Sequence, residues 1–246
     1  MRVLSDLEAL SLAVAEMLVG RISATVGRQG RCALVLTGGR TPRRMYEIWA
    51  ERFGASVPWR QVDVFWGDER YVPPDDPQSN YRLARAALLD RVPIPPANVR
   101  PMPTHHAGIV VAAREYEDLI RGYFKDRPPR FDILLLGLGA DGHVASLFPG
   151  QPALRERDRW VVAATVPADP PRRLTMTLPL INRARAVIFL VAGPAKAAAV
   201  RRAMTPGTAA DEVPAAGVAP ESGSLTWWLD AAAAGEIGEY GVARSK

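Results

Sequence analysis

The sequence predicts an α/β fold, a three-layer α/β/α sandwich with a mostly parallel central sheet. Three observations lead to this prediction. Short apolar segments alternate with amphipathic segments along the chain, which is the order of a βαβ protein. The apolar segment 133–136 shows no alternation of polar and apolar residues, so we expect both of its faces to be covered. Several apolar segments end in glycine-rich turns, as strands do at the carboxyl edge of a parallel sheet.

The first half of the chain begins with an amphipathic pattern. Residues 5–26 carry apolar side chains every three to four positions and predict a helix, with Ser5 as N-cap and Glu8 completing a capping box. A later helix is expected to begin at Pro42, which suits the first helical position, with Thr41 as its N-cap. The other elements expected in this half are strands at 32–36 and 62–66, a helix at about 80–90 capped by Ser79, and a helix at 108–124.

The second half repeats the alternation less regularly. Residues 205–223 are rich in Gly, Pro and Ala and predict a loop, and 225–234 predict a short strand that feeds a helix. The chain shows no internal repeat and no linker, so we expect a single domain over 1–246. The remaining elements expected here are strands at 133–136, 160–166, 174–178 and 186–191 and a helix at 195–203.

Composition excludes several classes of protein. The net charge is +5, but the basic residues are spread along the chain without a helix-turn-helix or RNP signature, so we expect no nucleic-acid partner. No uninterrupted apolar run reaches the roughly 18 residues that span a membrane, and the N-terminus carries acids early, unlike a secretory signal. We therefore expect no membrane partner and a cytoplasmic location. With one cysteine, Cys32, and three histidines, no zinc-type spacing is present, and no metal is expected.

The most informative stretch is 131–150, where the apolar strand runs into Gly137, Gly139 and Gly142. Asp141 and His143 lie in this turn. Histidine suits proton transfer at neutral pH, so His143 is a candidate general base that Asp141 can orient. A His that only hydrogen-bonds its loop, and an Asp that only forms the turn, are the alternatives. The spacing also matches a dinucleotide fingerprint, but Pro149 stops any following helix early, which argues against a nucleotide cofactor.

Charged and glycine residues follow other strands in the same way. Gly38, Gly39, Arg40 and Thr41 join a strand to a helix N-terminus, where free N–H groups and the helix dipole favour an anion; an ordinary turn is the alternative. Asp68, Glu69 and Arg70 end another strand, and because neighbouring side chains of a strand face opposite ways, at most one acid is expected to enter a site. Arg173 and Lys196 are two further cations beside strands. Lys196 lies at a helix start, where a cation opposes the helix dipole unless an anion is held there; a surface lysine is the alternative.

Taken together, these stretches resemble the 6-phosphogluconolactonase family, which is related to the glucosamine-6-phosphate deaminases. The family's SGGSTP loop is matched by TGGRTP at 37–42, its W-x-D-E-R-x-V…SN stretch by 66–72 with 79–80, and its LG-x-G-x-DGH-x-ASLFPG block by 136–150. Its R-[IL]-T-x-T, G-x-x-K and W-x-x-D-x-x-A motifs are matched at 173–177, 193–196 and 227–233. The motifs occur in the family's order along nearly the whole chain.

The resemblance implies a glucosamine-6-phosphate deaminase-like, modified Rossmann-type fold and hydrolysis of 6-phospho-D-glucono-1,5-lactone to 6-phospho-D-gluconate in the pentose phosphate pathway. It implies no cofactor, a small sugar phosphate as the partner, and a monomer or weak homo-oligomer. His143 is then the general base, with Asp141 beside it. The residues implied to bind substrate are Gly38, Gly39, Arg40, Thr41, Asp68, Arg70, Gly142, Arg173 and Lys196.

One departure from the family pattern matters, and two rival functions remain open. Arg40 stands where the family has Ser, which replaces a hydroxyl donor with a guanidinium. An amino-sugar-6-phosphate deaminase of the same fold is one rival, but in that family the DGH block continues with an F-N-E-P run bearing a catalytic Glu, and 145–149 contain no acid. A non-catalytic sugar-phosphate sensor is the other; only one helix precedes the first expected strand, too little for a DNA-binding module.

Overall fold

The computed structural model describes residues 1–105, 108–125 and 127–237 and is built around a six-stranded parallel sheet. Its strands are β1 (Arg2–Leu4), β2 (Cys32–Leu36), β3 (Val62–Trp66), β5 (Ile133–Leu136), β8 (Ala186–Val191) and β9 (Ser224–Asp230), in the spatial order β1-β9-β8-β5-β2-β3. All of the pairings are parallel. The predicted mostly parallel central sheet is confirmed.

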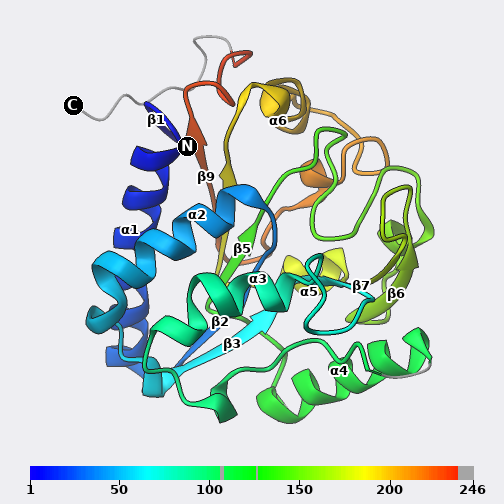
Figure 1. Ribbon diagram of the computed structural model, residues 1–246. Coiled ribbons are helices and arrows are strands. Elements are labelled where there is room, and N and C mark those ends of the chain that lie inside the picture. The colour runs from blue at the N-terminus through cyan, green and yellow to red at the C-terminus, as the bar shows by residue number, and fades with distance from the viewer. Residues whose placement is uncertain (106–107, 126, 238–246) are drawn as a thin grey trace.

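Helices cover the sheet on both sides. Figure 1 shows α1 and α2 together on one side of the strands, with α4 on the other side. The helices are α1 (Leu7–Gln29), α2 (Arg40–Ile48), α3 (Asn80–Ala87), α4 (Ile109–Phe124), α5 (Leu178–Ile181) and α6 (Ala197–Met204). Because helices lie on both faces, the central strands must be apolar throughout.

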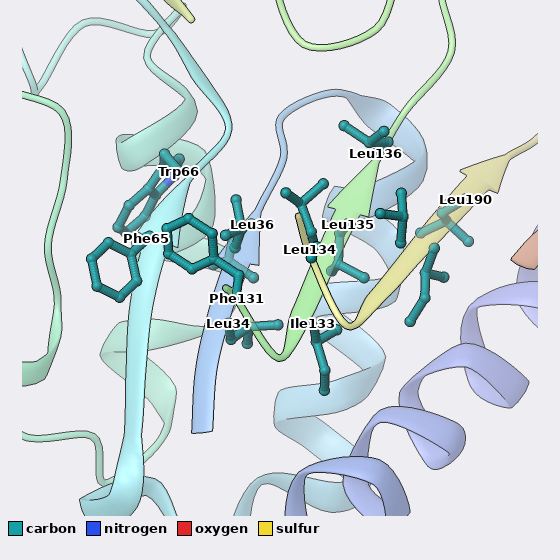
Figure 2. Close-up of a cluster of buried hydrophobic side chains, with 14 of the residues drawn as sticks. Leu34, Leu36, Phe65, Trp66, Phe131, Ile133, Leu134, Leu135, Leu136 and Leu190 are labelled. Atoms are coloured by element: carbon teal, nitrogen blue, oxygen red, sulfur yellow. The ribbon is translucent and has the colours of Figure 1, made fainter. Parts of the chain in front are cut away.

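The core lies where β2, β3, β5 and β8 meet. Each residue of β5 is at most 1% exposed, which explains the unbroken apolar run in its sequence. Figure 2 shows side chains of β5 packed between those of the neighbouring strands, with Phe65 and Phe131 at one end of the cluster. These two rings meet edge to face, with centroids 5.1 Å apart.

A second sheet was not predicted. Its three antiparallel strands are β4 (Asp68–Arg70), β7 (Arg172–Met176) and β6 (Val161–Thr165), in the order β4-β7-β6. The sequence indicates two of these strands, but it gives no sign that they leave the main sheet. The sequence gives no sign of strand β4 either, because three residues directly after Gly67 are too few to show the two-residue alternation of a strand.

The structure corrects several element boundaries. The N-cap of α1 is Asp6, whose Oδ1 accepts a hydrogen bond from the N–H of Ala9 at 2.9 Å, and not Ser5, whose hydroxyl donates to Asp6. Helix α2 begins at Arg40 after Gly39, so Thr41 lies inside the first turn and caps nothing. The helix expected after the last strand is wrong as well, since 231–236 form only turns.

Helix α1 is long and apolar enough to cross a membrane by length and composition, although no uninterrupted apolar run marks it in the sequence. Its Leu10, Val14, Leu18 and Ile22 are fully buried and belong to the hydrophobic core. A buried helix of a folded domain passes the same composition test, and the burial of this face assigns α1 to the core of the domain.

Candidate active site

A cavity of about 630 Å³ lies at the carboxyl ends of the parallel strands. It is lined by the turns that follow β2, β5 and β8, by the end of β9, and by side chains of β4 and β7 from the smaller sheet. The carboxyl edge of an open α/β sheet is where ligands bind in this class of fold.

The cavity gathers nearly all of the residues predicted from sequence. The lining includes Gly38, Gly39, Arg40, Thr41, Asp68, Arg70, His143, Arg173 and Lys196. Asp141 is not in the lining but contacts His143, and Gly142 lies behind the wall. Of the other histidines, His105 lies in the loop before α4 and not in the lining, and His106 is outside the described residues.

His143 is held by two contacts that fix its ring. Its Nδ1 lies 2.6 Å from Oδ1 of Asp141, which also accepts a hydrogen bond from the backbone N–H of His143. The ring stacks on Phe148, with centroids 3.9 Å apart and planes 17° apart. A carboxylate accepts hydrogen bonds only, so the neutral imidazole carries its proton on Nδ1 and leaves the lone pair of Nε2 free to act as a base.

The contact with His143 also changes the pKa of the Asp141 carboxyl group. Burial acts to raise its pKa, but the hydrogen bonds and charge of His143 outweigh burial, and the net shift is below the usual 3.8. Asp141 is therefore ionised at neutral pH and stabilises a positive charge on the imidazole.

Glycines allow this pairing. No helix begins within 137–150, directly after β5, which excludes the dinucleotide-binding interpretation of the glycine spacing. A Cβ at position 139 would lie 2.0 Å from Nδ1 of His143, so only glycine leaves room for the ring. Gly142 has a φ of 92°, and a Cβ there would lie 2.7 Å from Val213. The 205–223 tract thus packs behind the loop, and the N–H of Ala215 donates to the carbonyl of Gly142.

The turn after β2 has the geometry of an anion site. Gly39 has a φ of 110° and precedes α2, whose first N–H groups, those of Arg40 and Thr41, have no intrahelical partner; Pro42, which follows, has no N–H. The hydroxyl of Tyr46 fixes the start of the turn by hydrogen bonds to both the N–H and the carbonyl of Thr37. Gly38 is needed because the side chain of Asn80 lies against its α-carbon, where a Cβ would be 1.8 Å from Oδ1.

Four cations line the cavity. Within the described part of the chain, Arg40, Arg70, Arg173 and Lys196 form no salt bridge. Burial lowers the pKa of Lys196; Asp141 opposes this shift and the charge of Arg40 adds to it. Burial also lowers the pKa of Arg173, and its neighbour Arg70 adds to that shift. Cations held near one another without carboxylate partners favour a bound anion.

The two acids of β4 point in opposite directions, as expected. Asp68 lines the cavity, and its Oδ2 accepts a hydrogen bond from Ser146 at 2.7 Å. Glu69 is 2% exposed and faces α3, where it accepts hydrogen bonds from the N–H groups of Asn80 and Tyr81. Burial raises the pKa of Glu69 to about 7, against the lowering by these N–H groups.

Among the lining residues that were not predicted as site residues, Asn80 and Asp230 carry side chains suited to a polar contact. Asn80 is the first residue of α3, and Asp230 is the last residue of β9. Both belong to stretches that carry the family resemblance, but neither had a role assigned to it. The position of Asp230 at a strand end was the available signal, because strand ends at the carboxyl edge share one site.

The site combines an imidazole oriented by a carboxylate with a cavity wall that carries several cations without salt bridges. This combination defines the class of protein: an acid–base enzyme that acts on a small anionic molecule. Comparison of the sequence with those of known protein families identifies the family. The chain belongs to the family of glucosamine-6-phosphate isomerases and 6-phosphogluconolactonases, whose sequence profile matches residues 5–227.

Individual relatives agree with this assignment. The chain is 45% identical over 213 residues to a 6-phosphogluconolactonase of Synechocystis, covering 85% of this chain and 86% of that protein. It is 40% identical to a 6-phosphogluconolactonase of Nostoc, covering 96% and 97%. The fold is similar to the crystal structure of 6-phosphogluconolactonase from Thermotoga maritima, with a TM-score of 0.80 at 32% identity over 93% of this chain and 97% of that one. The resemblance predicted from the motifs is confirmed.

Proposed function

We propose that this protein hydrolyses 6-phospho-D-glucono-1,5-lactone to 6-phospho-D-gluconate, the lactonase step of the oxidative pentose phosphate pathway. The observation that carries the proposal is the His143–Asp141 pair at the wall of a cation-lined cavity. The relatives named above are 6-phosphogluconolactonases, which supports the same activity. Because these relatives are enzymes of central metabolism, we also propose a cytoplasmic location.

In the proposed mechanism, Nε2 of His143 takes a proton from water, and the resulting hydroxide attacks the carbonyl carbon C1 of the lactone. The bond between C1 and the ring oxygen then breaks. The imidazolium, stabilised by Asp141, returns its proton to the departing ring oxygen. One water is added, the ring opens to a carboxylic acid, and His143 ends in its starting state.

Two groups are available to stabilise the oxyanion that forms at C1. The guanidinium of Arg70 lines the cavity, and its Nε is buried without a hydrogen-bond partner among the described residues. Backbone N–H groups of the 137–142 turn are the other candidate donors. A donor placed for the tetrahedral intermediate contributes about 3–4 kcal/mol to catalysis in other enzymes.

The phosphate group is proposed to bind at the opposite end of the substrate from C1. Gly38, Gly39 and Thr41 offer N–H groups and a hydroxyl at the start of α2, and Arg40 and Lys196 supply positive charge. Arg40 thus replaces the lost Ser hydroxyl with a stronger, charged donor. Binding a group remote from the reacting carbon holds C1 near His143.

Deamination is the second candidate and is disfavoured by the same loop. Residues 145–149 of this chain are Ala, Ser, Leu, Phe and Pro, so no carboxylate follows His143 to serve ring opening and amine release. Release of ammonia from glucosamine 6-phosphate without lactonase turnover would reverse the choice between the two activities.

The test is turnover of freshly generated 6-phosphogluconolactone, coupled to 6-phosphogluconate oxidation and corrected for spontaneous hydrolysis. His143→Asn keeps the size of the side chain and removes the base, so kcat should fall by about 100-fold or more. A His143→Asn variant that turns over within a few-fold of the wild type would exclude His143 as the base, while leaving the activity itself intact.

A further inference from the structure

Asp230 is a buried carboxylate in the cavity wall that the mechanism above does not use. It ends β9, is 6% exposed, and accepts the backbone N–H of Gly193 on both oxygens, at 3.0 and 2.9 Å. Its Oδ1 also accepts the N–H of Ala233 at 2.7 Å. Both oxygens are therefore committed to the backbone of the neighbouring turns.

Gly193 begins the turn that carries Lys196. Its φ of 95° lies in the left-handed region, which favours glycine. The N–H of Lys196 donates to the carbonyl of Gly193 at 3.1 Å and closes a 3₁₀ turn over Pro194–Lys196, after which α6 begins. Two hydrogen bonds thus connect the carboxylate of Asp230 to the backbone of Lys196.

Lys196 depends on this backbone for its position. Its side chain has a flexible four-carbon stem, and no described carboxylate forms a salt bridge with it. Because no ion pair fixes the ammonium group, its position relative to a ligand depends on where the backbone places the Cα of Lys196.

We infer that Asp230 is a positioning residue for phosphate recognition, which holds the Gly193 turn so that Lys196 meets the phosphate of the substrate. The inference rests on the proposed function, because phosphate is the group that Lys196 is proposed to bind. Asp230 does not itself bind phosphate, since a carboxylate would repel it and both of its oxygens already accept backbone N–H groups.

The test compares KM, kcat and competitive inhibition by inorganic phosphate in matched variants. Asp230→Ala frees the N–H of Gly193 and should raise KM for the phospholactone about tenfold with kcat within about threefold, and weaken phosphate inhibition by a similar factor. Lys196→Ala should show the same pattern. Because Asp230 acts through Lys196, the double variant should match Lys196→Ala within about twofold.

Two further variants test the turn without deleting the carboxylate. Asp230→Asn keeps one acceptor oxygen, which in the place of Oδ1 can accept both N–H groups, but puts an NH2 donor where Oδ2 accepts the N–H of Gly193 at 2.9 Å, so it should recover only part of the phosphate affinity. Gly193→Ala adds a methyl group that meets no atom within 4 Å, so it acts only through the strained φ, and it should weaken phosphate inhibition with Asp230 intact. These two variants answer the question if Asp230→Ala does not fold.

Asp132→Ala is the matched control. Asp132 is a similarly buried carboxylate that accepts a backbone N–H, from Ala33 at 2.9 Å, but it lies at the amino end of β5. The Asp132→Ala substitution should lower the melting temperature and leave KM and phosphate inhibition unchanged. The inference would be overturned if the loss of phosphate affinity in the double variant equalled the product of the losses in the two single variants. A loss in kcat of Asp230→Ala with unchanged phosphate inhibition would also overturn it. Absence of lactonase turnover in the wild type would instead refute the proposed function.

Discussion

Asp141 and His143 are only two positions apart, and their contact depends on the glycines around them. Gly142 takes a left-handed φ of 92°, which turns the chain so that the carboxylate faces the ring, and Gly139 leaves the space that the ring occupies. The sequence indicated that the two residues share a turn. It did not indicate that they touch, because a separation of two does not fix side-chain direction.

Asp141→Asn tests the charge in this pair. The amide can still accept the hydrogen bond from Nδ1 but no longer stabilises the imidazolium that forms during the reaction. We expect kcat to fall about 10- to 100-fold with KM nearly unchanged, measured in the coupled assay. Asp211→Asn, which removes the charge of an exposed ion pair with Arg155, is the control and should leave kcat unchanged.

The lowered pKa of Lys196 predicts a pH dependence. Burial shifts its pKa below the ordinary 10.5, so the ammonium loses its charge at a lower pH than an exposed lysine does. Phosphate binding by the free enzyme should therefore weaken on the alkaline side, below the ordinary titration range of lysine. The inhibition constant of 6-phosphogluconate, measured from neutral to alkaline pH, reports this loss.

Lys196→Arg separates charge from other alkaline effects. A guanidinium keeps its charge across this range, so the alkaline weakening of 6-phosphogluconate binding should move to higher pH in this variant. If the alkaline limb stays where it is in the wild type, another group titrates and Lys196 is not its origin.

At the scale of elements, the short strand β4 carries two acids with different roles on its opposite faces. Asp68 faces the cavity, while Glu69 reaches the N-terminus of α3 and accepts the N–H groups of Asn80 and Tyr81, each at 2.7 Å. These are groups that a helix leaves unpaired at its start. Glu69 therefore caps α3 from a neighbouring strand, in addition to Ser79, whose hydroxyl accepts the N–H of Arg82 as predicted.

Glu69→Ala should destabilise the protein. Removing the carboxylate leaves buried N–H groups without acceptors, and the free energy of unfolding should fall by about 2–5 kcal/mol. Urea unfolding at neutral pH measures this change. Glu47→Ala, which removes a more exposed carboxylate paired with Arg43 and Arg44, should cost less than about 1 kcal/mol. Equal losses in the two variants would contradict the role of Glu69.

Strand positions in the parallel sheet could be predicted from sequence because buried strands there read as short apolar runs, unbroken except for Asp63 in 62–66. The runs at 32–36, 62–66, 133–136 and 186–191 coincide with observed strands. Helix starts were less accurate, since adjacent polar residues such as Ser5 and Asp6 compete for the same cap. Strand β4 was missed because its three residues pair only with β7, more than a hundred positions away.

The candidate site was predicted in outline for the same reason. Parallel strands bring their carboxyl ends to one edge, so residues after different strands were expected to meet, and Gly38, His143 and Lys196 do line one cavity. The strand end marked Asp230 as a candidate, but nothing in the sequence connects it to Gly193, whose N–H it accepts.

At the scale of the whole molecule, the cavity joins the two sheets. The parallel sheet supplies His143 and Lys196, whereas the smaller sheet supplies Asp68, Arg70 and Arg173. A ligand that contacts both sets of residues ties the two sheets together, and binding should therefore be visible in global stability.

Thermal unfolding with 6-phosphogluconate measures this effect. At a ligand concentration about 100 times the Kd, the stabilisation is about 2.7 kcal/mol, which corresponds to a Tm increase of roughly 5–10 °C for a chain of this size. Gluconate at the same concentration should shift the Tm much less, and Lys196→Ala should lose most of the shift. Equal shifts with gluconate and 6-phosphogluconate would show that the phosphate is not recognised.

The pairing of β1 with β9 has a consequence for the order in which the molecule is completed. Among the described strands, β1 pairs with β9 alone, and Arg2 lies opposite Trp228. Strand β1 is synthesised long before its partner β9, and such long-range closure slows folding. Because Asp230 ends β9, the inferred support of the Lys196 turn also depends on this pairing. A nascent chain can bury its central strands early, but it cannot complete the proposed phosphate site until β9 has been synthesised.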